Sequence, residues 1–199
     1  MKELKTQKER EFLEKISGYF FDLSSKDGNL ICPKHKIEHT GKNIYSAVID
    51  TRLYELTANE EYYNRIKKRV KVTLGKLIKD PEYGYWIFYP GRLNRWNMSN
   101  SIIDAGACVD VLSSFYLKFF NRLSLDERKD IKEAIFRNSD TYLKQNILTK
   151  DVINQRLWGG TGLSSAYKIF KNNDWKEALL SCVNKSLSFR SDCSNIISP

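Results

Sequence analysis

Long stretches with helical periodicity, joined alternately by long and short links, are the feature that most constrains this chain. Apolar residues recur at helical spacing over residues 4–23, 42–57, 60–79, 100–122, 125–148, 161–170 and 174–189. Irregular segments at 30–41, 81–99 and 149–160 precede the second, fourth and sixth of these stretches. The helix that follows each of those three is reached by a short link. This pattern predicts an all-α fold built from helix hairpins.

A weak internal repeat supports the hairpin arrangement. Ala47-Val48-Ile49-Asp50 recurs about 60 residues later as Ala107-Cys108-Val109-Asp110, and Ser165-Ala166 begins a partial third copy. Each hairpin has one apolar face and needs neighbours to bury it. We therefore expect a hairpin-repeat domain at 30–189, preceded by a helix and turn at 1–29 and followed by an irregular tail at 190–199. The first helix of each hairpin would form an inner layer, with the long loops on one rim.

Short signals mark helix ends and close packing. Ser124 followed by Glu127 predicts a capping box at the start of the fifth helix, and Asp174 is the expected cap of the seventh. The run Ala105-Gly106-Ala107-Cys108 predicts close packing of the fourth helix on a neighbour. Cys108 and Cys182 lie inside helical patterns and are expected in the core.

The formal net charge of +9 favours anionic partners. The lysines of the chain are dispersed, as in residues 67–71, and this is typical of a solvated helix face. We therefore do not expect nucleic acid as a partner. The chain has no secretory leader and no long apolar stretch. We therefore expect a cytoplasmic protein with reduced cysteines and no membrane partner.

Known cofactor and nucleophile motifs are absent from the sequence. It contains no P-loop, no GxGxxG fingerprint, no GxSxG and no CxxC, so no cofactor is expected. Cys32, His35 and His39 form a Cys-x2-His-x3-His run. Zinc would need a fourth ligand, and the spacing matches no known finger. We therefore predict no metal site.

Several local signatures, together with the hairpin pattern, resemble the six-hairpin glycosidase and polysaccharide-lyase superfamily over most of residues 30–189. They are Tyr45, Tyr54, Tyr62 and Tyr63, and the runs Trp86-Ile87-Phe88-Tyr89, Arg95-Trp96-Asn97-Met98-Ser99-Asn100 and Trp158-Gly159-Gly160-Thr161-Gly162. The resemblance implies an (α/α) toroid. This chain supplies about three of about six hairpins, so the expected toroid is incomplete. Either the chain is a fragment of a longer enzyme or a partner chain completes the ring.

The same resemblance implies a carbohydrate-active protein that acts on or binds acidic, uronic-acid-containing oligosaccharides or polysaccharides. Aromatic rings stack on the apolar faces of sugars, and Trp86, Tyr89, Trp96 and Trp158 are candidates for this role. Alternatively, these rings fill the mouth of the toroid.

Arginines on the expected loops are candidates for holding the acidic group. Arg92, Arg95 and Arg156 lead toward the N-termini of the inner helices, where backbone N–H groups favour a carboxylate or phosphate. The alternative is that these arginines brace the loops or stack on Trp96 and Trp158.

Candidates for proton transfer also lie near the inner helices. His39 precedes one of them and can act as a general base. By resemblance to the lyases, Tyr89 would share this task while Arg95 and Asn97 hold the substrate carboxylate. Asp104 would serve a hydrolase, which also needs a second carboxylate. Asp50 and Asp110 lie deeper and fit buried partners of Arg or Tyr. A non-catalytic repeat module that binds a protein partner is the alternative function.

Overall fold

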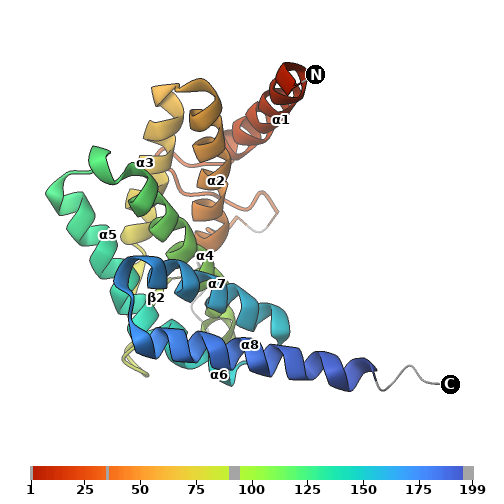
Figure 1. Cartoon of the computed structure of the whole chain (residues 1–199). Coiled ribbons are helices and arrows are strands. Elements are labelled where there is room, and N and C mark those ends of the chain that lie inside the picture. Colours follow the sequence, from red (N-terminus) through yellow and green to blue (C-terminus); the bar gives the residue numbers. More distant parts are fainter. Residues whose placement is uncertain (1, 35, 90–94, 195–199) are drawn as a thin grey trace.

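A computed structural model describes the backbone of residues 2–34, 36–89 and 95–194, with the side chains of 6–34, 36–89 and 101–188. Figure 1 shows a mostly helical chain with one small antiparallel hairpin of strands. The elements are α1 (Lys2–Asp22), α2 (Thr40–Thr57), α3 (Glu60–Leu74), β1 (Leu77–Lys79), β2 (Trp86–Phe88), α4 (Arg95–Phe119), η1 (Phe120–Arg122), α5 (Leu125–Asn138), η2 (Ser139–Leu143), α6 (Lys144–Thr149), α7 (Ile153–Phe170) and α8 (Asn173–Ser194). The all-α prediction is confirmed.

Three helices form an inner row, in which α4 packs against both α2 and α7. The direction of α4 along α2 follows from two contacts. Gly41 meets Asp104 near the start of α2, and Glu55 forms an ion pair with Lys118 near its end. Along α7, Gly106 lies against Trp158, and the Ser165 hydroxyl donates to Asp110 at 2.6 Å. The partner residue number rises with position along each helix, so adjacent helices run in the same sense, while their axes fan out from α2 to α7 (Figure 1).

A second helix returns along each member of the inner row. α3 packs on α2, α5 on α4 and α8 on α7, so the chain forms three successive hairpins. The segment α5–η2–α6 continues as one helical path from Leu125 to Thr149, with a π-helical turn at η2. This is the hairpin repeat expected from the link lengths. Closure into a toroid remains a prediction.

The core lies between the inner row and the returning helices. Fully buried apolar side chains come from every hairpin, and they include Ile44, Leu53, Ile66, Ile102, Leu112, Ile131, Ile135, Leu163 and Trp175. The buried face of α2 is narrower than the apolar pattern of residues 42–57 indicates, because Val48 is 46% exposed. Cys108 and Cys182 are buried, as predicted.

Glycines set the distance between α4 and α7. An added Cβ at Gly106 would lie 2.2 Å from the carbonyl oxygen of Trp158, and one at Gly162 would lie 2.6 Å from the carbonyl oxygen of Gly106. Each helix backbone therefore lies directly against the other. The small residues of α4 do pack closely, as predicted.

The predicted start of the sixth helix is wrong. The segment 149–160 was expected to be irregular, yet α7 begins at Ile153. Gly159 and Gly162 have low helix propensity, which costs about 1 kcal/mol each. Their close packing on α4 and on Ile102 and Ile147 offsets that cost. Thus the glycines that resembled a loop are helix-contact residues.

The segment after α3 also differs from its prediction. The third helix ends at Leu74 rather than near 79, and β1 pairs with β2 across the expected irregular segment. Asp80 nucleates the turn, because its Oδ1 accepts from the backbone N–H groups of Glu82 and Tyr83 at 2.7 and 3.1 Å. Gly84 adopts a φ of 71°, which favours glycine.

The helix caps follow the sequence in one case and depart from it in another. Ser124 and Glu127 form the predicted capping box. At α8 the cap is Asn172, whose Oδ1 accepts from the N–H of Asp174 at 2.9 Å, so the assignment of Asp174 as the cap is wrong. α8 then continues to Ser194, into the tail expected to be irregular from 190; residues 195–199 lie outside the described residues.

We predict that Gly106→Ala destabilises the protein, because its methyl group would overlap the Trp158 carbonyl oxygen. Overpacking of this kind costs about 1–3 kcal/mol in the free energy of unfolding. Gly18→Ala is the matched control, because Gly18 lies in α1 with no atom within 4 Å of its added Cβ. The control should raise stability by about 0.5–1 kcal/mol. Urea unfolding monitored by circular dichroism measures both, and equal effects would contradict the packing assignment.

Candidate functional site

The first turn of α2 brings three sequence-predicted catalytic residues into one neighbourhood. His39 is the N-cap residue, and its carbonyl oxygen accepts from the Asn43 N–H at 2.8 Å. The neighbouring Thr40 hydroxyl donates to the carbonyl oxygen of Tyr89, just after β2. Next along the chain, the Gly41 N–H donates to Asp104 Oδ1 on α4 at 2.8 Å. The backbone of His39, the backbone carbonyl of Tyr89 and the carboxylate of Asp104 therefore lie at residues 39–41, although these residues are distant in sequence.

Gly41 is required for this arrangement. A Cβ at this position would lie 2.3 Å from Asp104 Oδ1, so the carboxylate occupies the space that a side chain would fill. α2 and α4 approach closely here, and the exposed backbone N–H of a helix N-terminus obtains an acceptor. The contact explains why a glycine follows Thr40 inside the first turn of α2.

Burial changes the acidity of Asp104. Loss of water around its carboxyl raises the pKa above the ordinary value of 3.8, while the Gly41 N–H and the Lys42 charge oppose that shift. A carboxyl group with a raised pKa keeps its proton to higher pH and can act as a general acid. No second carboxylate has a recorded contact with Asp104 within the described side chains.

Two aromatic rings lie beside this cluster on the inner row. Tyr45, one turn along α2 from Gly41, packs edge-to-face on Trp158 of α7, with ring centroids 5.3 Å apart and an interplanar angle of 73°. Both side chains are partly exposed. Trp158 therefore stands on a helix, not on a loop as expected. The pair leaves aromatic surface facing solvent between α2 and α7.

Trp86 lies elsewhere. The guanidinium of Arg137 sits 4.3 Å from its ring centroid, and its backbone carbonyl accepts from the Asn138 amide at 2.8 Å. The backbone N–H of Trp86 donates to Thr141 Oγ1 at 2.9 Å. Trp86 thus packs on the end of α5 and on η2, and none of its recorded contacts reaches the first turn of α2.

Arg156 braces the start of α7. The side chain is 0% exposed, its Nε and Nη2 both donate to the carbonyl oxygen of Lys150, and its Nη1 lies 3.5 Å from Ser186 Oγ. This is the bracing alternative considered for the arginines, and such a guanidinium does not face a ligand at the surface.

The remaining predicted substrate-binding residues precede or begin α4. Arg92 lies outside the described residues. Arg95, Trp96 and Asn97 form the first turn of α4, and their side chains also lie outside the described part of the chain. The backbone of α4 leads from this turn directly to Asp104. Their predicted roles therefore remain predictions.

Asp50 is a buried partner of an arginine, as the sequence indicated, whereas Asp110 is only partly buried and pairs with a serine rather than with Arg or Tyr. Asp50 accepts from the Ser17 hydroxyl at 2.5 Å and forms an ion pair with Arg69, whose Nε lies 3.5 Å from Oδ2. Burial raises the pKa of Asp50 and lowers that of Arg69. Asp110 accepts from Ser165. Each carboxylate joins an inner helix to a neighbouring helix.

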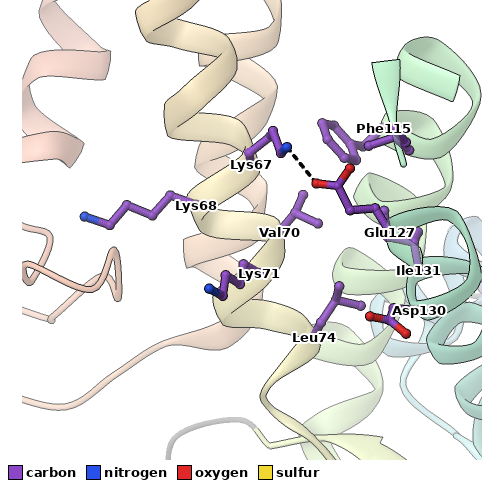
Figure 2. Close-up of a pocket in the computed structure, with 10 residues that line it drawn as sticks. Lys67, Lys68, Val70, Lys71, Leu74, Phe115, Glu127, Asp130 and Ile131 are labelled. Atoms are coloured by element: carbon purple, nitrogen blue, oxygen red, sulfur yellow. Dashed lines mark ion pairs between the residues drawn. The ribbon is translucent and has the colours of Figure 1, made fainter. Parts of the chain in front are cut away.

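Sequence reasoning missed a groove between α3 and α5, which has a volume of about 470 Å³ (Figure 2). Its apolar lining consists of Val70, Leu74, Phe115, Leu123 and Ile131. An ion pair crosses the groove, with Lys67 Nζ 2.6 Å from Glu127 Oε1. Glu127 also completes the capping box of α5, so this pair is part of the scaffold. The signal in the sequence was the apolar stripe of α3 between its lysines.

Searches for two other kinds of feature were negative over the described residues. No helix there is both long and apolar enough to cross a bilayer. Nor does that part of the chain contain three or more His, Cys, Asp or Glu side chains grouped to hold a metal ion. Cys32 is partly buried, and His35 lies outside the described residues.

Comparisons with protein-family models, with curated proteins and with solved structures gave no significant match.

We predict that Asp104→Asn is more stable than the wild type at neutral pH. The folded-state pKa of Asp104 is raised, so its contribution to stability is full below pH 3.8 and is lost as the pH rises through the folded-state value. Asparagine keeps an oxygen acceptor for the Gly41 N–H and removes the buried charge. Urea unfolding at pH 7 and below pH 3.8 measures the difference, which should shrink on acidification. A variant that is less stable at pH 7 would contradict this electrostatic account.

Proposed function

We propose that the protein binds acidic, uronic-acid-containing glycans at the surface around the first turn of α2. The observation that supports this proposal is that the backbone of His39, the backbone carbonyl of Tyr89 and the Asp104 carboxylate all lie at residues 39–41. These are the proton-transfer residue types that the sequence resemblance to the six-hairpin superfamily implies. They come from three separate elements, which is usual for a site assembled by a fold.

The neighbouring groups suit an acidic sugar. Tyr45 and Trp158 present partly exposed rings on the same inner row, and sugar faces stack on such rings. Lys42, in the first turn of α2, adds a positive charge close enough to affect Asp104. In a lyase-type step, His39 removes the proton next to the sugar carboxyl group and Asp104 donates a proton to the leaving oxygen. His39 is the N-cap residue of α2, and Asp104 accepts from Gly41 in the first turn of the same helix.

We predict selective binding of uronic-acid oligosaccharides over neutral ones of equal length, measured by isothermal titration calorimetry. His39→Gln and Asp104→Asn should each weaken binding or abolish any formation of unsaturated product, followed by ultraviolet absorbance. Asp130→Asn on α5 is the matched control for the charge change, because Asp130 lies in the α3–α5 groove. A wild-type protein that binds neither class of sugar would overturn the proposal.

A repeat module that binds a protein partner is the second candidate function. The hairpin α7–α8 has a half-exposed apolar edge, formed by Leu157, Leu180, Val183 and Leu187. An open groove of about 610 Å³ runs between these two helices. In the hairpin repeat, the corresponding edge of α4–α5 is covered by α7. Exposed apolar edges of this kind are typical of interaction surfaces.

If this edge binds a partner, Leu180→Glu should abolish that complex and leave the melting temperature of the isolated chain nearly unchanged. Leu125→Glu is the control, because Leu125 is an exposed leucine on α5. Affinity purification followed by sedimentation velocity with the recovered partner measures the complex. Retention of the same partner by both variants would rule out this edge as the binding surface.

A further inference from the structure

We propose that a pocket between the end of α1 and the middle of α3 binds a small tetrahedral oxyanion, the group shared by phosphate and sulfate esters. The pocket has a volume of about 240 Å³. Four cationic side chains line it, Lys26, Arg65, Lys68 and Arg69, and no carboxylate is among its lining residues. Arg69 links the pocket to Asn43 in the first turn of α2, but none of the lining residues is assigned to the glycan surface, so this proposal does not rest on that function.

Three of the four cations come from one face of α3. Arg65, Lys68 and Arg69 are spaced three and four residues apart, which places them on the same side of the helix. Lys68 also borders the α3–α5 groove, but its side chain extends away from Glu127, as Figure 2 shows. Its Nζ donates to the carbonyl oxygen of Lys26, and neither lysine forms an ion pair with a carboxylate among the described side chains. Both positive charges are therefore available to an anion.

The two arginines are held in place before any ligand arrives. Arg65 stacks on Phe21, with its guanidinium carbon 4.3 Å from the ring centroid. Its Nη1 donates to Ser17 at 3.2 Å, and its Nη2 forms an ion pair with Glu61. Arg69 is buried between Asn43 Oδ1 at 3.3 Å and Asp50 Oδ2 at 3.5 Å. Ordering these side chains costs little on binding, because they are already fixed.

Each arginine also retains a donor that is not fully satisfied. The buried Nε of Arg65 has no hydrogen-bond acceptor, and that of Arg69 has only Asp50 Oδ2, at the long distance of 3.5 Å. Burial, together with the neighbouring Arg65 charge, lowers the pKa of Arg69, although Asp50 opposes this shift. Crowded cations with an incomplete set of acceptors are stabilised by an added anion.

A glycine turn closes the pocket beside Lys68. Gly28 has a φ of 87°, and its N–H donates to the Ser25 carbonyl at 2.9 Å. An added Cβ at Gly28 would lie 3.0 Å from Lys68 Cγ, so the turn rests directly on the lysine stem. The Ser25 hydroxyl lines the same pocket and accepts from the Asn29 N–H at 3.2 Å, which leaves its hydrogen to donate to a ligand.

The size of the pocket limits the ligand. Sites for whole drug-sized molecules occupy about 300–1,000 Å³, so this pocket takes an anionic group with the rest of the molecule outside. Phe21, which is half-exposed, offers a ring at the same place for the part that remains outside. Phosphate esters and sulfate esters of sugars both fit this description, and direct binding distinguishes them.

The test is isothermal titration calorimetry of the full chain, at constant ionic strength, with inorganic phosphate, glucose 6-phosphate and glucose 6-sulfate. We expect saturable binding of at least one ester and a loss of about tenfold or more in affinity for Lys68→Gln and for Lys26→Gln. Lys129→Gln on α5 makes the same charge change outside the pocket and should bind like the wild type. The ester that binds more tightly shows whether the pocket takes a phosphate ester or a sulfate ester.

Two results would overturn the proposal. One is the absence of binding by the wild type with all three probes. The other is equal weakening in Lys68→Gln, Lys26→Gln and Lys129→Gln, which would show that net charge attracts the anion without a defined pocket. Circular dichroism melts of the three variants keep the comparison restricted to folded protein, and both lysines in the pocket are exposed side chains.

Discussion

The backbone contact between α4 and α7 is the constraint on which the rest of the fold depends. Gly106, Gly159 and Gly162 have no side chains to separate the two helices, so carbonyl groups of one lie against the backbone of the other. α4 is thereby fixed between α2 and α7. The same helix carries Asp104 to the first turn of α2, so the candidate site is set by the packing of α4 as much as by local loop structure.

Hydrogen bonds between polar side chains fix how adjacent helices of this row are aligned along their axes. Ser17 on α1 donates to Asp50 on α2, and Ser165 on α7 donates to Asp110 on α4. An aspartate on an inner helix thus accepts from a serine on a neighbouring helix in two successive hairpins. Sliding the first pair by one residue would leave the buried Asp50 carboxylate without its hydroxyl donor, which costs more than the bond itself contributes; Asp110 is partly exposed, so the cost for the second pair is smaller. The repeated Asp that the sequence shows at 50 and 110 is therefore a register device.

Sequence reasoning identified the helices and the order of the hairpins, because these follow from apolar periodicity and link length. It also placed long loops before the first helix of the first two hairpins. It failed where tertiary contacts outweigh local propensity. Gly159 and Gly160 indicated a loop, yet both lie inside α7, which packs on α4 through Gly159 and on α8 through Gly160. At the site, His39, Tyr89 and Asp104 were chosen by residue type, and their proximity depends on the unforeseen contacts of Thr40 and Gly41. The basic pocket was missed because Lys26 and the α3 cations are more than thirty residues apart in the chain.

The order of the hairpins has a consequence for how the molecule responds to stress. Each hairpin packs mainly on its sequence neighbours, so stability propagates along the row as a sum of nearest-neighbour terms. α4–α5 has partners on two sides, whereas α7–α8 has one exposed edge. Opening should therefore begin at α8 and proceed inward, and α4 should be the last helix to exchange its amide hydrogens with solvent. The candidate site shares that late-opening helix, so local fraying at α8 leaves the first turn of α2 intact.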